Sequence, residues 1–130
     1  MKPSAQVDRF LRLPNAAVMG CVRPDGYPMT VVTWYDWEDE RVLINMDEKR
    51  SRLAWMRANP KVSFSVFDDD WYRHVSFTGD VVDIHEDPQL VDIDRLAVRY
   101  TGRPFGNRAA KRISAWVEPR AWHVWELDRE

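Results

Sequence analysis

The sequence has little of what several protein classes require. Its single cysteine, Cys21, cannot form an internal disulfide, and the amino-terminal segment lacks the apolar core of a secretory signal, so a reducing cytoplasm is expected. No hydrophobic run approaches the roughly 20 residues that span a bilayer, which argues against a transmembrane helix. The 19 basic side chains nearly balance the 21 acidic ones, so the basic excess of a general nucleic-acid binder is missing.

The common catalytic signatures are missing as well. The chain has no G-x-S-x-G, no Walker-type phosphate loop and no H-E-x-x-H. Cys21 lies in an apolar segment, which favours a buried structural thiol over a nucleophile. The histidines His74, His85 and His123 are scattered without the spacing of metal ligands, so no metal site is expected.

Aromatic side chains, in contrast, are abundant. The chain has 7 tryptophans, a residue that is favoured in ligand clefts and interfaces. The candidates for a cleft that faces a flat ring are Trp34, Trp37 and Trp71. Burial in the core or in an interface between subunits is expected for Trp55, Trp116 and Trp125.

Alternating apolar residues and turn signals predict many short strands and few helices. Strands are predicted over 16–22, 28–37, 41–46, 61–68, 71–84, 113–117 and 121–125. Helices are predicted over 4–13, 51–59 and 88–100, with Asp47 and Asp87 as N-cap residues of the last two. Gly79 marks a bulge or a point of close approach in its strand. The pattern predicts a small β-barrel with helical decoration, formed by one domain over residues 1–130.

One local cluster of charge stands out, at the junction between a strand and the short helix. Lys49, Arg50 and Arg52 place three cations within four residues. The guanidinium groups of Arg50 and Arg52 can converge on one phosphate at the start of a helix, where the helix dipole favours an anion. A solvated helix in which Glu48 pairs with Arg52 is the alternative. Spacing alone leaves both interpretations open.

The order of the segments adds a further signal. In chain order they are a strand, a turn with Asp25-Gly26-x-Pro28, two strands, Arg50-x-Arg52, a helix ending in Asn59-Pro60-x-Val62, a strand, a long strand with Gly79, and the closing Val117-Glu118-Pro119-Arg120-Ala121-Trp122. This order resembles the pyridoxamine 5'-phosphate oxidase-like flavin and deazaflavin oxidoreductases, and best their coenzyme F420-dependent branch.

The resemblance implies a mainly β fold, an FMN-binding split β-barrel of about six antiparallel strands. It implies a homodimer with the cofactor at the interface, and a reductase that passes a hydride from coenzyme F420 to a small conjugated substrate. No side chain is singled out as an essential catalyst, although Tyr72 or water could donate a proton. The cofactor contacts that it implies are Val32, Thr33, Trp34, Asn45, Met46, Lys49, Arg50, Arg52 and Trp71.

Three alternatives stay open. The same fold can bind FMN instead of F420, the protein can bind a cofactor or haem without turnover, or it can be a structural dimer that has lost its cofactor. Trp55 precedes Met56 in the helix, near the position where many relatives carry an asparagine beside the phosphate, and an indole does not reproduce the hydrogen bonds of an amide. The C-terminal arginine and histidine signature of true pyridoxamine-phosphate oxidases is also absent, which argues against oxidation of vitamin B6.

Overall fold

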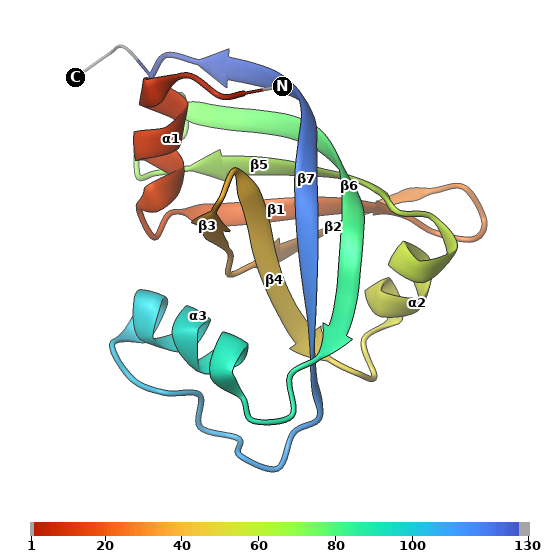
Figure 1. Ribbon diagram of the computed structural model, residues 1–130. Helices are drawn as coiled ribbons and strands as arrows, with labels where there is room; N and C mark the ends of the chain where they lie inside the picture. Colours follow the sequence, from red (N-terminus) through yellow and green to blue (C-terminus); the bar gives the residue numbers. More distant parts are fainter. Residues whose placement is uncertain (1, 128–130) are drawn as a thin grey trace.

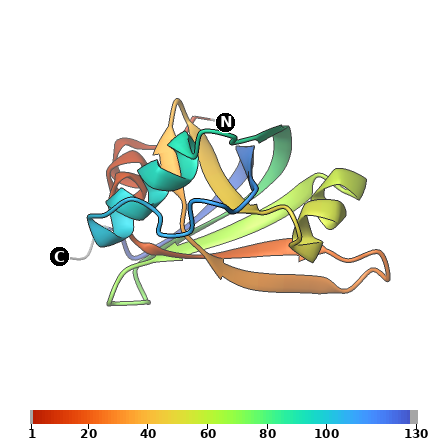
Figure 2. The same ribbon diagram turned by 90° about the horizontal axis from the view of Figure 1, so that it is seen from below.

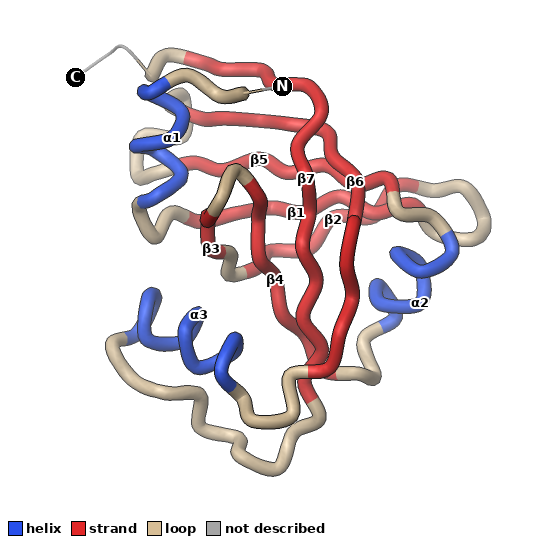
Figure 3. Tube along the Cα trace, in the orientation of Figure 1, coloured by secondary structure: helices blue, strands red, loops and turns tan. Residues whose placement is uncertain are grey.

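Seven strands form one antiparallel sheet, in the order β2-β1-β5-β6-β7-β4-β3. The computed structural model describes residues 2–127. The strands are β1 (Ala16–Val22), β2 (Pro28–Thr33), β3 (Asp36–Glu38), β4 (Arg41–Asp47), β5 (Lys61–Phe67), β6 (His74–Glu86) and β7 (Arg112–Trp125). The helices are α1 (Ala5–Arg12), α2 (Ser51–Ala58) and α3 (Val91–Thr101). The mainly β architecture agrees with the prediction (Figure 3). No helix within residues 2–127 is long and apolar enough to cross a membrane.

The two strands that form the edges of this sheet, β2 and β3, follow one another directly in the chain. The run 28–37, predicted as a single strand, is broken: β2 forms one edge, β3 forms the other, and only Trp34 and Tyr35 connect them. Since so short a link spans little distance, the sheet must curl until its edges approach. The long strands β6 and β7 provide the curvature and bend sharply (Figure 1), so that β6 pairs with β5 near its start and β7 pairs with β4 near its own.

Gly79 lies at the point where β6 changes register against β7. The register shifts between Thr78 and Gly79, where Arg120 is the extra residue, so the irregularity lies at Gly79 but the bulged strand is β7. A Cβ atom at this position would lie 2.8 Å from the carbonyl oxygen of Glu118 and 2.9 Å from Cγ1 of Val117. Opposite Gly79 is Pro119, which has no N–H to donate, and the shift accommodates it. The final segment is therefore one strand, β7, and the predicted break at 118–119 is wrong.

The core fills the interior of the curled sheet. Val62, Phe64 and Val66 of β5 are all buried, as their alternation predicts. Phe64 stacks on Phe77 of β6 with ring centroids 5.2 Å apart. Trp37 also belongs to this core, since it is 4% exposed and its Nε1 donates a hydrogen bond to Asp8 at 2.9 Å. It therefore faces the interior instead of a ligand cleft.

Both predicted N-cap positions differ from the observed ones. The N-cap residue of α2 is Arg50, not Asp47, and no side chain caps this helix. The N-cap of α3 is Leu90 in the left-handed region, not Asp87. The buried Asp87 carboxylate nevertheless accepts hydrogen bonds from the backbone N–H groups of Asp92 (3.2 Å) and Ile93 (2.9 Å), so it caps α3 from outside the helix.

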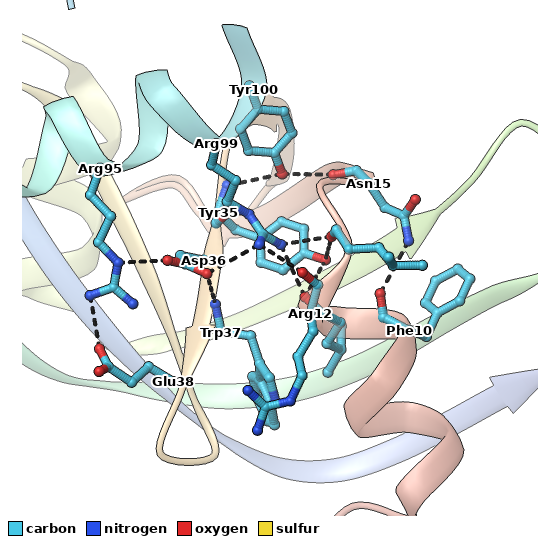
Figure 4. A network of polar contacts seen from close by, with 12 residues as sticks. Phe10, Arg12, Asn15, Tyr35, Asp36, Trp37, Glu38, Arg95, Arg99 and Tyr100 are labelled. Atoms are coloured by element: carbon cyan, nitrogen blue, oxygen red, sulfur yellow. Dashed lines mark hydrogen bonds and ion pairs between the residues drawn. The ribbon is translucent and has the colours of Figure 1, made fainter. Parts of the chain in front are cut away.

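A polar network attaches α3 to α1 and to the link between β2 and β3 (Figure 4). The guanidinium of Arg99 donates hydrogen bonds to the carbonyl oxygens of Leu11, Arg12 and Leu13, which satisfies the C-terminal carbonyls of α1. Its Nε donates to the carbonyl of Tyr35 at 2.9 Å. The seam between the two sheet edges is therefore held in one position relative to α3.

Candidate cofactor site

The N-terminus of α2 carries positive charge that no acidic side chain of its first turn neutralises. Arg50 is its N-cap residue, no side-chain hydrogen bond caps it, and its first turn contains no acidic residue. The positive end of the helix dipole adds to the charges of Arg50 and Arg52. Glu48, the proposed partner of Arg52, instead lies 3.5 Å from the ammonium of Lys111. The structure therefore does not support the interpretation of this segment as a solvated Glu48–Arg52 pair.

Arg52 is the most unusual side chain in this region. Its Nε and Nη1 atoms are buried and have no hydrogen-bond partner among the described residues. Burial lowers the pKa of its guanidinium, and the positive charges of Arg50 and Arg112 lower it further. Buried, unpaired nitrogen atoms of a guanidinium are costly unless an anion approaches them. The neighbouring Cys21 is an inert thiol, because burial raises its pKa.

These arginines line a hollow of about 390 Å³ between α2 and the edge strand β2, here called the α2 hollow. Its lining residues are Cys21, Met29, Thr30, Val31, Val32, Arg50, Ser51, Arg52 and Trp55. The guanidinium of Arg23 lies 5.9 Å from the ring centroid of Trp55. Trp55 packs against the core, as expected, and it also forms a wall of this hollow.

A second hollow of about 330 Å³, the α3 hollow, adjoins the first. Its lining residues are Val32, Thr33, Trp34, Asn45, Arg50, Ile93, Leu96, Phe105 and Arg112. Val32 and Arg50 line both hollows, so the two spaces meet there. Figure 2 shows α2 and α3 on opposite sides of the end of β4, which lies between them.

Trp34, the aromatic wall of the α3 hollow, is held in place by Tyr100 of α3. Trp34 stacks on Tyr100 of α3, with ring centroids 5.6 Å apart and planes 7° apart. The hydroxyl of Tyr100 donates a hydrogen bond to the carbonyl of Asn15 at 2.7 Å (Figure 4). The indole of Trp34 therefore presents a rigid flat surface.

Asn45 forms the polar floor of the α3 hollow. Its amide Nδ2 donates to Asp87 (3.2 Å) and to the hydroxyl of Ser114 (3.0 Å), and its Oδ1 accepts a hydrogen bond from Nε of Arg112 (2.9 Å). Because every amide atom of Asn45 has a partner, the side chain is held in one orientation. Asn45 thus positions Arg112.

The hydrogen-bond chain continues from Ser114 to the surface. Ser114 donates to Asp92 at 2.6 Å, and the imidazole of His85 lies 3.3 Å from Asp92 and 2.6 Å from Asp83. Partial burial opposes protonation of His85, but the hydrogen bonds to Asp83 and Asp92 outweigh it, and its pKa is raised.

This shift predicts how His85 contributes to stability at different pH. A group whose pKa rises on folding stabilises the fold below its unfolded pKa, and the contribution is lost as the pH rises through the folded pKa. We expect His85→Gln to lower the free energy of unfolding at pH 5, by less than about 1 kcal/mol because the group is partly exposed. At pH 8 the change should vanish. Urea denaturation at the two pH values tests this, and equal losses at both would contradict it.

The structure brings six of the nine predicted cofactor contacts to these hollows. They are Val32, Thr33, Trp34, Asn45, Arg50 and Arg52. Met46 lies in the core at 1% exposure, and Lys49 is exposed without lining either hollow. Trp71 is 65% exposed and stacks on Tyr72, with ring centroids 4.6 Å apart, in the loop between β5 and β6.

Sequence reasoning missed three parts of the site. Phe105 belongs to the loop after α3, Ile93 and Leu96 belong to α3 itself, and Arg112 is the first residue of β7. Arg112 is paired in register with Asp47, just before the arginine cluster. Only the pairing of β4 with β7 could have indicated it.

Comparison with known proteins identifies the family. Residues 3–126 match the family described as pyridoxamine 5'-phosphate oxidase. The chain belongs to this family. Among solved structures, one named F420 reductase shares 32% identity with it over 94% of this chain and 98% of the other, with a TM-score of 0.83.

Two solved structures of lower identity share the fold. The conserved hypothetical protein Rv2991 from Mycobacterium tuberculosis is 24% identical over 98% of this chain and 86% of its own, with a TM-score of 0.78. General stress protein 26 from Bacillus anthracis is 17% identical over 93% and 92% of the two chains, with a TM-score of 0.70. The curled sheet is thus the split barrel of this family. No curated protein matches the sequence.

Proposed function

We propose that this protein is a coenzyme F420-dependent reductase that binds the phosphate of the cofactor at the start of α2. The observation that carries the proposal is Arg52, whose two buried, unpaired nitrogen atoms lie beside Arg50 at an uncompensated helix N-terminus. A phosphate group supplies the anion that this arrangement needs. The 32% identity to the structure named F420 reductase supports F420 as the molecule that carries the phosphate.

The remaining residues of the two hollows suit a flat cofactor ring. Val32 is 73% exposed where the hollows meet, and Thr33 and Trp34 follow it along the chain. These residues bind and orient the ring, while Trp34 and Trp55 exclude water from its surroundings. When bound, F420 supplies the hydride, so no protein nucleophile is needed. The acceptor in this proposal is a small conjugated molecule.

A titration distinguishes this proposal from its rivals. We expect F420 to bind in the micromolar range and FMN about tenfold or more weakly, both followed by quenching of the fluorescence of Trp34 and Trp55, which line the hollows. The opposite order would indicate an FMN enzyme. Binding of neither would refute the proposal, and tight binding without any turnover of reduced F420 would indicate a carrier.

The proposal includes a homodimer that completes the site. The edge strand β2 exposes apolar side chains, with Met29 at 48% and Val31 at 36%, and exposed apolar edges are normally covered. Trp71 and Tyr72 form an exposed aromatic pair that a second copy can place against the ring. We expect analytical ultracentrifugation to give the mass of two chains, and Val31→Asp to shift the protein toward one. A monomer at all concentrations would contradict this.

A further inference from the structure

A carboxylate of α3 binds the loop between α3 and β7, residues 102–111 (Figure 1). Asp94, in the first turn of α3, accepts two hydrogen bonds from the guanidinium of Arg108, at 2.6 and 3.1 Å. It also accepts a hydrogen bond from the backbone N–H of Phe105 at 3.0 Å. The same guanidinium donates to the carbonyl oxygen of Phe105 at 3.1 Å. These four contacts are here called the Asp94 clasp.

The clasp fixes the main chain of Phe105. The loop contains no helix or strand, so ordering it costs conformational entropy that regular hydrogen bonding does not offset. A two-pronged pair between a guanidinium and a carboxylate imposes a defined geometry as well as attraction. The hydrogen bonds with Arg108 lower the pKa of Asp94, and the carboxylate raises the pKa of Arg108, so both groups are charged at neutral pH.

The residue held in this way lines the α3 hollow. Phe105 is the only aromatic residue of the loop, and its ring centroid lies 4.8 Å from Cζ of Arg112. Arg112 is itself bound through Nε to Asn45. The clasp therefore holds the main chain of Phe105 while Arg112 contacts its ring. The hollow thus has a second aromatic side chain besides Trp34, and this one belongs to a loop that an ion pair attaches.

We propose that Phe105 closes the α3 hollow over the cofactor ring, and that Asp94 is a positioning residue that acts on the ring through Phe105. The inference rests on the proposed function, which places the ring in this hollow beside Thr33 and Trp34. It adds the loop between α3 and β7 to the cofactor site. An aromatic side chain suits this role because it packs on a flat ring and excludes water from it.

The test uses the deazariboflavin part of F420, which contains the ring but no phosphate. Quenching of its fluorescence measures its affinity for the full chain and for each variant. We expect Phe105→Ala to weaken binding about tenfold, through loss of one aromatic contact, and Asp94→Ala to weaken it nearly as much. The double variant should bind no more weakly than Phe105→Ala, because residues that act through one contact are not additive.

Two further measurements separate positioning from general support of the fold. Asp94→Asn retains an acceptor for the N–H of Phe105 but loses the charge that binds Arg108, so its affinity should be intermediate. Glu38→Ala removes another carboxylate that pairs with an arginine of α3, Arg95 at 2.8 Å, and should leave the affinity unchanged. Hydrogen exchange of the Phe105 amide, followed by NMR without ligand, should be several-fold faster in Asp94→Ala than in Glu38→Ala.

Several results would overturn the proposal. They are no binding of the deazariboflavin, unchanged affinity in Phe105→Ala, losses that add in the double variant, and equal exchange of the Phe105 amide in Asp94→Ala and Glu38→Ala. A parallel titration with complete F420 separates this proposal from the preceding one. If the ring alone binds and responds to Phe105→Ala but F420 binds no more tightly, the phosphate site at α2 is wrong and the role of Phe105 stands.

Discussion

Changing Arg50 and Arg52 together to methionine should weaken binding of the phosphate-bearing cofactor by roughly 10²- to 10⁴-fold. Each charge-assisted hydrogen bond contributes about 1.5–3 kcal/mol, and each 1.4 kcal/mol is about a factor of ten in affinity. Fluorescence titration of the double variant with F420 and with FMN measures the loss. Unchanged affinity for both would show that the phosphate binds elsewhere.

Removal of Arg52 weakens cofactor binding in this proposal, but it should stabilise the fold when no ligand is present. Arg52→Met replaces a guanidinium with two buried, unpaired nitrogen atoms by an apolar chain of similar length, so we expect the free energy of unfolding to rise by about 1–3 kcal/mol. Arg57→Met, at an exposed position of the same helix, should change it by less than about 0.5 kcal/mol. Loss of stability in Arg52→Met would identify the guanidinium as a structural group instead of a binding group.

A large loss of stability is expected when Gly79 is changed. Gly79→Ala should lower the free energy of unfolding by about 1–3 kcal/mol, because its Cβ would lie 2.8 Å from the carbonyl oxygen of Glu118, a backbone atom that cannot rotate away. The register shift that relieves the pairing of β6 with β7 leaves no room for a side chain. Urea denaturation of the two proteins measures the difference.

Gly106→Ala is the matched control for this substitution. A Cβ atom at Gly106 has no neighbour within 4 Å, so the same chemical change should alter the free energy of unfolding by less than about 1 kcal/mol. If Gly79→Ala proves as mild as Gly106→Ala, the close approach of β6 to β7 at the bulge does not exist in solution.

Local patterns were sufficient wherever one physical rule acts along the chain. Alternation placed Val62, Phe64 and Val66 on the buried face of β5, and a glycine within a strand indicated the irregularity at Gly79. The arginine pair at 50 and 52 was found because two forks at this spacing suit one phosphate. The order of such segments was specific enough to indicate the family.

The sequence could not show which of two neighbouring candidate residues lines a hollow and which lies in the core. Trp34 and Trp37 are three residues apart, yet the first lines the α3 hollow and the second is buried against α1 through Asp8. Asn45 and Met46 are adjacent, but Asn45 lines the hollow while Met46 lies in the core. Alternation places neighbours such as Asn45 and Met46 on opposite faces of β4, but which face lines the hollow depends on the path of the strand in the curled sheet, which no local window contains.

The family, the mainly β class and the arginine pair could therefore be inferred from the residues alone, since each depends on neighbours within a few positions or on their order. The α3 hollow required the tertiary structure. Arg112 reaches Asn45 only because β4 pairs with β7 across 67 residues of chain, and Phe105 reaches Arg112 only because the loop after α3 covers the end of that pair. Contacts between such distant segments are set by the packing of the whole sheet, and this packing places Arg112 in the lining of the hollow.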